Sequence, residues 1–131
     1  MKVLIATQKP FAAAAVKGIR EILEGAGHEV VLLEKYAEAK DLIDAVADVE
    51  AMIIRSDKVT PEVLDAAKKL KIVVRAGAGF DNVDLAAATA HGVVVENTPG
   101  QNANAVAELA IALMIFMSRN QFTPVSGIEV Q

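Results

Sequence analysis

The chain has 131 residues, of which 53% are hydrophobic and 23% charged, and it carries a net charge of −4 at pH 7. This length and apolar share suit one domain with a hydrophobic core, and the acidic balance argues against nucleic acid or an anionic membrane as a partner, because both require a basic excess. Cysteine is absent and histidine occurs only twice, so we expect neither thiolate chemistry nor a metal site.

Short apolar runs alternate with segments of helical periodicity from the first residues onward. The N-terminal run, Val3–Ala6, is too short for a signal peptide, and no later run is long enough to span a membrane, so we expect a cytoplasmic protein. The apolar runs predict strands at residues 3–6, 30–33, 52–54, 72–74 and 93–95. The periodic segments predict helices at residues 11–26, 41–46, 61–70, 83–90 and 102–119. Thr60 is the expected cap of the third helix, and Asp81 and Asn82 are the expected caps of the fourth.

Strands that alternate with helices predict a parallel sheet with right-handed crossovers and helices on both faces. The strands are almost wholly apolar, as is typical of parallel strands that are buried on both faces. We therefore predict an α/β fold, a flavodoxin-like, doubly wound parallel sheet of about five strands that ends in a long helix. In this architecture ligands lie beyond the carboxyl ends of the strands, so the loops that follow the strands are the candidates for a site.

Unusual chemistry is found in three loops that follow predicted strands: Arg55–Asp57, Arg75–Asn82 and Glu96–Asn102. Gly77 and Gly79 have no side chains, so the backbone N–H groups there can approach an anionic ligand closely. Arg55 or Arg75 can bind a carboxylate or a phosphate through two parallel hydrogen bonds. The sequence therefore predicts an anion-binding site at the carboxyl edge of the sheet.

The glycine-containing turn and Arg55 both have simpler interpretations. The Gly77-Ala78-Gly79 turn begins like a dinucleotide-binding loop, but it follows the fourth strand, and Asn82 stands where the third glycine belongs, so we reject that function. The turn can instead be an ordinary connection in which glycine supplies a positive φ. Arg55 can likewise form nothing more than a surface ion pair with a nearby acid.

A family resemblance is carried by the stretch VVRAGAGFDNVDLAAATAHGVVVENTPGQNANAVAELAIALM, together with the segments KVLIATQKP and IIRSDKVT. These residues resemble the substrate-binding domain of the D-isomer-specific 2-hydroxyacid dehydrogenases. The resemblance implies an NAD-dependent oxidoreductase that acts on a small anionic 2-hydroxy or 2-oxo acid. Among the members most similar to this chain the substrate is phosphorylated, and the implied reaction is the oxidation of 3-phosphoglycerate to 3-phosphohydroxypyruvate at the entry to serine biosynthesis.

The resemblance also assigns roles to individual residues. Arg55 and Ser56 match positions that face the charged groups of the substrate. In the family the substrate carboxylate is held by backbone amides of a loop, and that loop matches Ala76, Gly77, Ala78 and Gly79. Asn102 matches a position near the substrate, and Val106 one near the nicotinamide of NAD. Ala103 departs from the Ser or Thr that often stands there. The family's catalytic arginine, glutamate and histidine and its glycine-rich NAD loop lie in another domain, so no catalytic residue is expected in this chain.

The implied organisation is a substrate-binding domain at residues 1–101, an interdomain helix at 102–119, and a linker at 120–131 toward an NAD-binding domain that this sequence lacks. The long helix is apolar on nearly all sides, so we expect a second domain or chain to cover it, as in a homodimer of the full-length protein. Alone, the chain is not expected to catalyse hydride transfer. The alternative function is a stand-alone, non-catalytic module that binds an anion or a partner protein.

Overall fold

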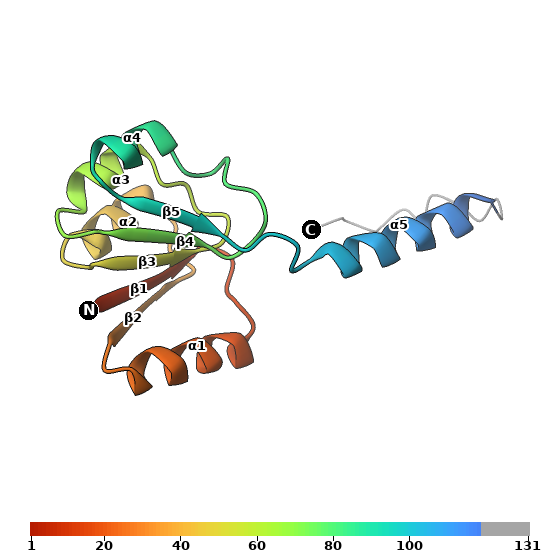
Figure 1. The fold of residues 1–131 in the computed structure, drawn as a ribbon, viewed down its shortest axis with the longest axis horizontal. Helices are drawn as coiled ribbons and strands as arrows, with labels where there is room; N and C mark the ends of the chain where they lie inside the picture. Colours follow the sequence, from red (N-terminus) through yellow and green to blue (C-terminus); the bar gives the residue numbers. More distant parts are fainter. Residues whose placement is uncertain (119–131) are drawn as a thin grey trace. The chain divides into compact units, whose positions relative to one another are not determined.

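The computed structural model describes residues 1–118, which form a parallel sheet followed by a separate helix. The strands are β1 (Lys2–Thr7), β2 (Glu29–Glu34), β3 (Ala51–Ile54), β4 (Ile72–Arg75) and β5 (Val94–Asn97). All neighbouring strands are parallel, and their order in the sheet is β2-β1-β3-β4-β5 (Figure 1). This is the flavodoxin-like order, so the predicted fold class is confirmed.

The helices that connect the strands lie on the two faces of the sheet. They are α1 (Ala13–Gly25), α2 (Ala39–Val46), α3 (Pro61–Ala66) and α4 (Leu85–Ala90). Figure 1 shows α2, α3 and α4 on one face of the sheet and α1 on the other. The core lies under the three helices, where buried strand residues such as Met52 and Val73 meet helix residues such as Leu42 and Leu64. The face with α1 is covered less completely within residues 1–99, because no residue of α1 is buried and Ile22 is 74% exposed.

Several predicted helix boundaries differ by one or more residues, and for the third and fourth helices packing against distant residues explains the difference. The third helix ends at Ala66, four residues early, because Ala67 leaves the helical region and the following turn brings the buried Leu70 into the core. Thr60 does stand at the N-cap position of this helix, although its side chain makes no capping hydrogen bond.

The fourth helix begins at Leu85, because Val83 is drawn into a parallel bridge with Val59 and is buried. The cap of α4 is therefore Asp84, whose Oδ1 accepts a hydrogen bond of 2.9 Å from the N–H of Ala87. The prediction that Asp81 and Asn82 cap this helix is wrong.

Helix α5 (Ala103–Ser118) belongs to a second compact unit, which begins at Gly100, whereas the sheet and its helices form the unit Met1–Pro99. Apolar side chains are exposed on all sides of α5, among them those of Val106, Leu109, Met114 and Phe116. The predicted domain boundaries stay predictions, and the predicted linker at 120–131 and Arg119 lie outside the described residues.

Candidate functional site

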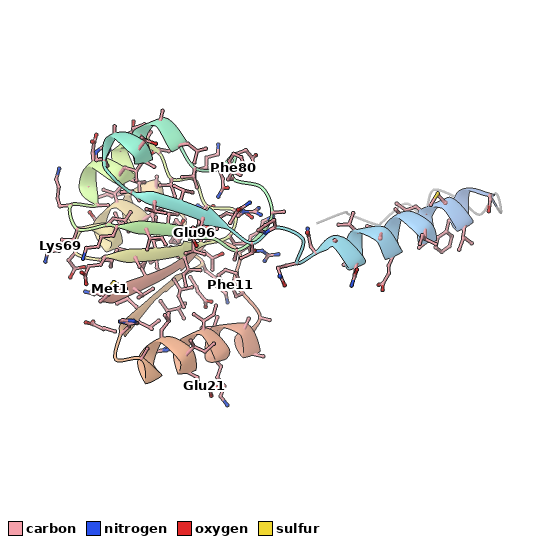
Figure 2. All side chains as sticks on the ribbon, in the orientation of Figure 1. Met1, Phe11, Glu21, Lys69, Phe80 and Glu96 are labelled. Carbon is pink, nitrogen blue, oxygen red and sulfur yellow. The ribbon has the colours of Figure 1, made fainter. Side chains whose placement is uncertain are left out.

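The three predicted loops start side by side at the carboxyl edge of the sheet. Strand register pairs Ile54 with Arg75 and Arg75 with Asn97, so β3, β4 and β5 end next to one another. Phe80, which is labelled in Figure 2, is half exposed on the loop after β4. Together with Glu96 and Asn97 of β5 it lines a cavity of about 190 Å³.

Arg55 and Ser56, which directly follow β3, are both exposed. Within residues 1–118 no acidic oxygen lies within 4.0 Å of the Arg55 guanidinium, so the structure gives no support to a surface ion pair. An exposed guanidinium without an acidic neighbour keeps its donors available for a carboxylate or phosphate. Arg55 therefore remains a candidate anion-binding residue.

Arg75, the other candidate, is already in contact with the neighbouring backbone. Its Nε donates a hydrogen bond of 2.9 Å to the backbone carbonyl of Arg55. Its guanidinium also fills the space beside Gly77, where an added Cβ would lie 1.7 Å from Nη1 of Arg75. The sequence offers both Arg55 and Arg75 as anion-binding residues. The structure favours Arg55, because Nε of Arg75 links the loops after β3 and β4 while the Arg55 side chain is free.

The four predicted amides of the loop after β4 fall into two pairs. The N–H of Ala76 donates to the carbonyl of Ile54 at 2.8 Å, and the N–H of Gly77 donates to the carbonyl of Arg75 at 2.9 Å. For the N–H groups of Ala78 and Gly79, no acceptor is found in the described part of the chain. Only this second pair is free to hold an anion.

The end of β5 holds the same loop by its carbonyl groups. Asn97 donates its Nδ2 hydrogen to the carbonyl of Ala78 at 2.6 Å, and Thr98 donates its N–H to the carbonyl of Gly77 at 2.9 Å. Both peptide carbonyls are therefore turned toward β5. Sequence analysis placed Asn97 in one of the three candidate loops but gave its side chain no role of its own.

A buried carboxylate lies beneath this surface and was missed by sequence analysis as a functional residue. Asp57 is 3% exposed, and its carboxylate accepts hydrogen bonds from the N–H of Gln8 at 2.8 Å, the hydroxyl of Tyr36 at 2.5 Å and the N–H of Arg55 at 3.3 Å. Burial raises the pKa of Tyr36 above its ordinary value, and the hydrogen bond to Asp57 raises it further. The hydroxyl of Tyr36 therefore stays protonated and acts as a donor. No local sequence signal distinguishes Asp57 from an exposed loop acid.

Asn82 connects Asp57 to the loop after β4. Its Nδ2 donates a hydrogen bond of 2.7 Å to the backbone carbonyl of Asp57, while its buried Oδ1 has no partner among the described residues. Asn82 thus connects the glycine-containing loop to the loop after β3 instead of capping α4.

A cavity of about 250 Å³ opens beside Asp57, lined by Ser56, Lys58 and Tyr36 among others. A larger hollow of about 470 Å³ lies between α1 and β2, but both of its basic residues are already paired within α1, Arg20 with Glu24 at 2.9 Å and Lys17 with Glu21 at 3.7 Å. The smaller cavity is the one that adjoins a predicted site residue, Ser56.

The two remaining predicted residues, Asn102 and Val106, belong to the second unit and are exposed. Their roles near the substrate and NAD stay predictions. Among residues 1–118 no group of three His, Cys, Asp or Glu side chains is placed to hold a metal ion. None of the helices described is both long and apolar enough to cross a membrane.

Comparison with known proteins gives consistent matches. Residues 4–126 match the family model described as D-isomer specific 2-hydroxyacid dehydrogenase, catalytic domain. The chain is 46% identical over 101 residues to D-3-phosphoglycerate dehydrogenase of Sus scrofa, which covers 76% of this chain and 19% of that protein. It is 44% identical over 120 residues to D-3-phosphoglycerate dehydrogenase of Archaeoglobus fulgidus, which covers 91% of this chain and 21% of that protein.

A solved structure matches the whole chain. It is the NAD+-bound 3-phosphoglycerate dehydrogenase of Entamoeba histolytica, with a TM-score of 0.88 and 53% identity over all of this chain and 43% of that one. The chain therefore spans about a fifth of the curated relatives and less than half of this structure.

Proposed function

This chain belongs to the D-isomer specific 2-hydroxyacid dehydrogenase family, and we propose that it is the substrate-binding part of an NAD-dependent enzyme that oxidises 3-phosphoglycerate to 3-phosphohydroxypyruvate. The names of the similar proteins support this choice of substrate. The observation that carries the proposal is the exposed Arg55 guanidinium, which has no acidic neighbour among the described residues and follows β3 at the edge where the N–H groups of Ala78 and Gly79 are free.

The substrate has two anionic groups, a carboxylate and a phosphate, and this edge offers two kinds of donor. The Arg55 guanidinium can bind one anion through two parallel hydrogen bonds, and the N–H pair of Ala78 and Gly79 can bind the other. Together they would hold the substrate between them and so fix its orientation for hydride loss from the carbon that bears the hydroxyl group. The contribution of this chain to catalysis is thus binding and orientation.

The proton of the substrate hydroxyl must go to a base that these residues do not provide. His28 directly precedes β2 and His91 lies just before β5, so both are at the amino edge of a parallel sheet, opposite the site. His91 is also bonded to Asp65 and to the carbonyl of Ala87. General base catalysis requires hydrogen-bond reach, so neither histidine is a candidate, and we infer that the base comes from another domain.

The described residues do not form a cradle for NAD. The Gly77–Gly79 turn follows β4, Asn82 replaces the third glycine of a dinucleotide loop, and the Arg75 guanidinium fills the space beside Gly77. NAD would supply the hydride acceptor from a domain outside this chain, and we assign only the exposed Val106 a contact with it.

The test is steady-state kinetics of Arg55→Ala in the complete polypeptide that carries this chain, with 3-phosphoglycerate and with D-glycerate as substrates. Loss of a charge-assisted hydrogen bond costs about 1.5–3 kcal/mol, so kcat/KM for 3-phosphoglycerate should fall about 10- to 100-fold. If Arg55 binds the phosphate, kcat/KM for D-glycerate should stay constant, and if it binds the carboxylate, both values should fall.

Arg20→Ala is the matched control, because Arg20 is an exposed arginine on α1 whose partner is Glu24 of the same helix. Its loss should leave kcat/KM unchanged for both substrates. Equal kinetics of Arg55→Ala and Arg20→Ala would remove Arg55 from the site. Binding of 3-phosphoglycerate without any NADH formation by the complete polypeptide would favour the alternative, a non-catalytic binding module.

A further inference from the structure

We propose that Asp57 is a positioning residue, which holds the Arg55–Ser56 turn in the orientation that binds the substrate; this inference rests on the function proposed above. Asp57 is 3% exposed, although the two residues before it are exposed. Burial of a carboxylate is unfavourable unless hydrogen bonds replace its hydration. The groups that donate hydrogen bonds to the Asp57 carboxylate come from three different loops, so the carboxylate connects these loops.

The two carboxylate oxygens have different partners. Oδ1 accepts from the N–H of Gln8 at 2.8 Å and from the hydroxyl of Tyr36 at 2.5 Å. Oδ2 accepts from the N–H of Arg55 at 3.3 Å. Gln8 follows β1 and Tyr36 lies after β2, so one oxygen fastens Asp57 to two neighbouring strands while the other fastens the turn that begins with Arg55.

The backbone of Arg55 is thereby held on both sides. Its N–H donates to Asp57, and its carbonyl accepts the 2.9 Å hydrogen bond from Nε of Arg75. A residue whose N–H and C=O are both bonded has little freedom to rotate, so the direction in which its side chain leaves the sheet is set. A donor held in place before the substrate arrives loses less entropy on binding than a mobile one.

The backbone of Asp57 is linked to the second half of the site. The backbone carbonyl of Asp57 accepts from Nδ2 of Asn82 at 2.7 Å, and Asn82 ends the loop that contains the free N–H groups of Ala78 and Gly79. Asp57 thus lies where the two anion-binding elements are joined, although its own side chain is buried below them.

Because the two carboxylate oxygens have different partners, Asp57→Asn can distinguish an effect on the position of Arg55 from an effect on folding. An amide keeps one acceptor oxygen, and placing that oxygen at Oδ1 preserves the hydrogen bonds from Gln8 and Tyr36. The amide NH₂ then faces the N–H of Arg55, and two donors repel one another. Asp57→Asn should therefore release the Arg55 turn while leaving Asp57 fastened to β1 and β2. Tyr36→Phe does the reverse, since it removes one donor to Oδ1 and leaves Arg55 bonded.

The experiment measures KM for 3-phosphoglycerate, kcat and the thermal midpoint of the complete enzyme for five variants: Asp57→Asn, Tyr36→Phe, Arg55→Ala, the double variant Arg55→Ala/Asp57→Asn, and Asp44→Asn. Asp44 is an exposed acid on α2 without a hydrogen bond or ion pair to another described side chain, and it serves as the matched control. Asp57→Asn should raise KM about tenfold with kcat changed less than about threefold, as expected when a binding group loses its place. Tyr36→Phe should lower the thermal midpoint and leave KM unchanged.

The double variant decides whether Asp57 acts through Arg55. In the Arg55→Ala background, Asp57→Asn should raise KM less than about threefold, because the side chain that it positions is gone. An equal rise in both backgrounds would overturn the inference, and so would an unchanged KM in Asp57→Asn when Arg55→Ala raises KM. An unchanged KM in Arg55→Ala would instead overturn the proposed role of Arg55 and this inference with it. If Asp57→Asn does not fold, Asp57→Ser replaces it, and the same outcomes apply.

Discussion

Gly77→Ala tests whether the Arg75 guanidinium really fills the space beside Gly77. An alanine Cβ at this position would lie 1.7 Å from Nη1 and 2.6 Å from Cζ of Arg75, so the guanidinium must move away. Moving it breaks the 2.9 Å hydrogen bond from Nε to the carbonyl of Arg55. Gly77 also has φ of +154°, a conformation that residues with a side chain rarely adopt.

The two effects give the expected magnitude. The lost hydrogen bond contributes about 1 kcal/mol, less than is usual for a charged donor, because Arg75 is only half buried. The unfavourable φ adds about 1 kcal/mol. Gly77→Ala should therefore lower the free energy of unfolding by about 2 kcal/mol, measured by urea denaturation of the chain.

Two further variants make the result decisive. Gly18→Ala is the matched control, because Gly18 lies inside α1 with nothing within 4 Å of its added Cβ, and it should stabilise the chain by about 0.5–1 kcal/mol. In an Arg75→Ala background the clash is absent, so Gly77→Ala should cost only about 1 kcal/mol there. A cost of Gly77→Ala that is the same with and without Arg75 would refute the proposed contact.

Two other predictions concern the packing of α4. Asp84→Ala should destabilise the chain by about 1 kcal/mol through loss of the N-cap, whereas Asp81→Ala should change the urea midpoint little; the opposite ranking would contradict the assigned cap. The pKa of His91 is raised above its ordinary value, first by the hydrogen bond with the Ala87 carbonyl and then by the one with Asp65. Protonated His91 is thus favoured in the folded state, so its stabilisation is complete below the unfolded pKa of 6.5 and is lost as pH rises through the folded value. The stability advantage of the wild type over His91→Gln should be larger at about pH 6 than at about pH 9, and an advantage independent of pH would contradict this.

The order of elements was predicted correctly from the sequence alone, and the sequence also predicted where the candidate site lies. Apolar runs separated by helical periodicity predicted all five strands within two residues at each end. The prediction works because both faces of a covered parallel strand are buried, so most of its side chains must be apolar. The strand order then placed the loops after β3, β4 and β5 at one edge, where Arg55 is found. The family resemblance was carried by longer stretches of sequence that contain these three loops.

What each loop residue does was decided by contacts across the sheet. Arg55 and Arg75 are equivalent in sequence, since both are arginines at a strand end. Arg75 is a structural donor because the loop after β3 places the carbonyl of Arg55 2.9 Å from its Nε, while no acidic oxygen lies within 4.0 Å of the Arg55 guanidinium among the described residues. Asp57 looks like an exposed loop acid until Tyr36, 21 residues away, donates its hydroxyl to it. The cap of α4 moved to Asp84 because Val83 pairs with Val59. A local pattern specifies which residues bury apolar surface, but the partner of a buried polar group depends on which strands and loops become neighbours, and that is determined only when the sheet assembles.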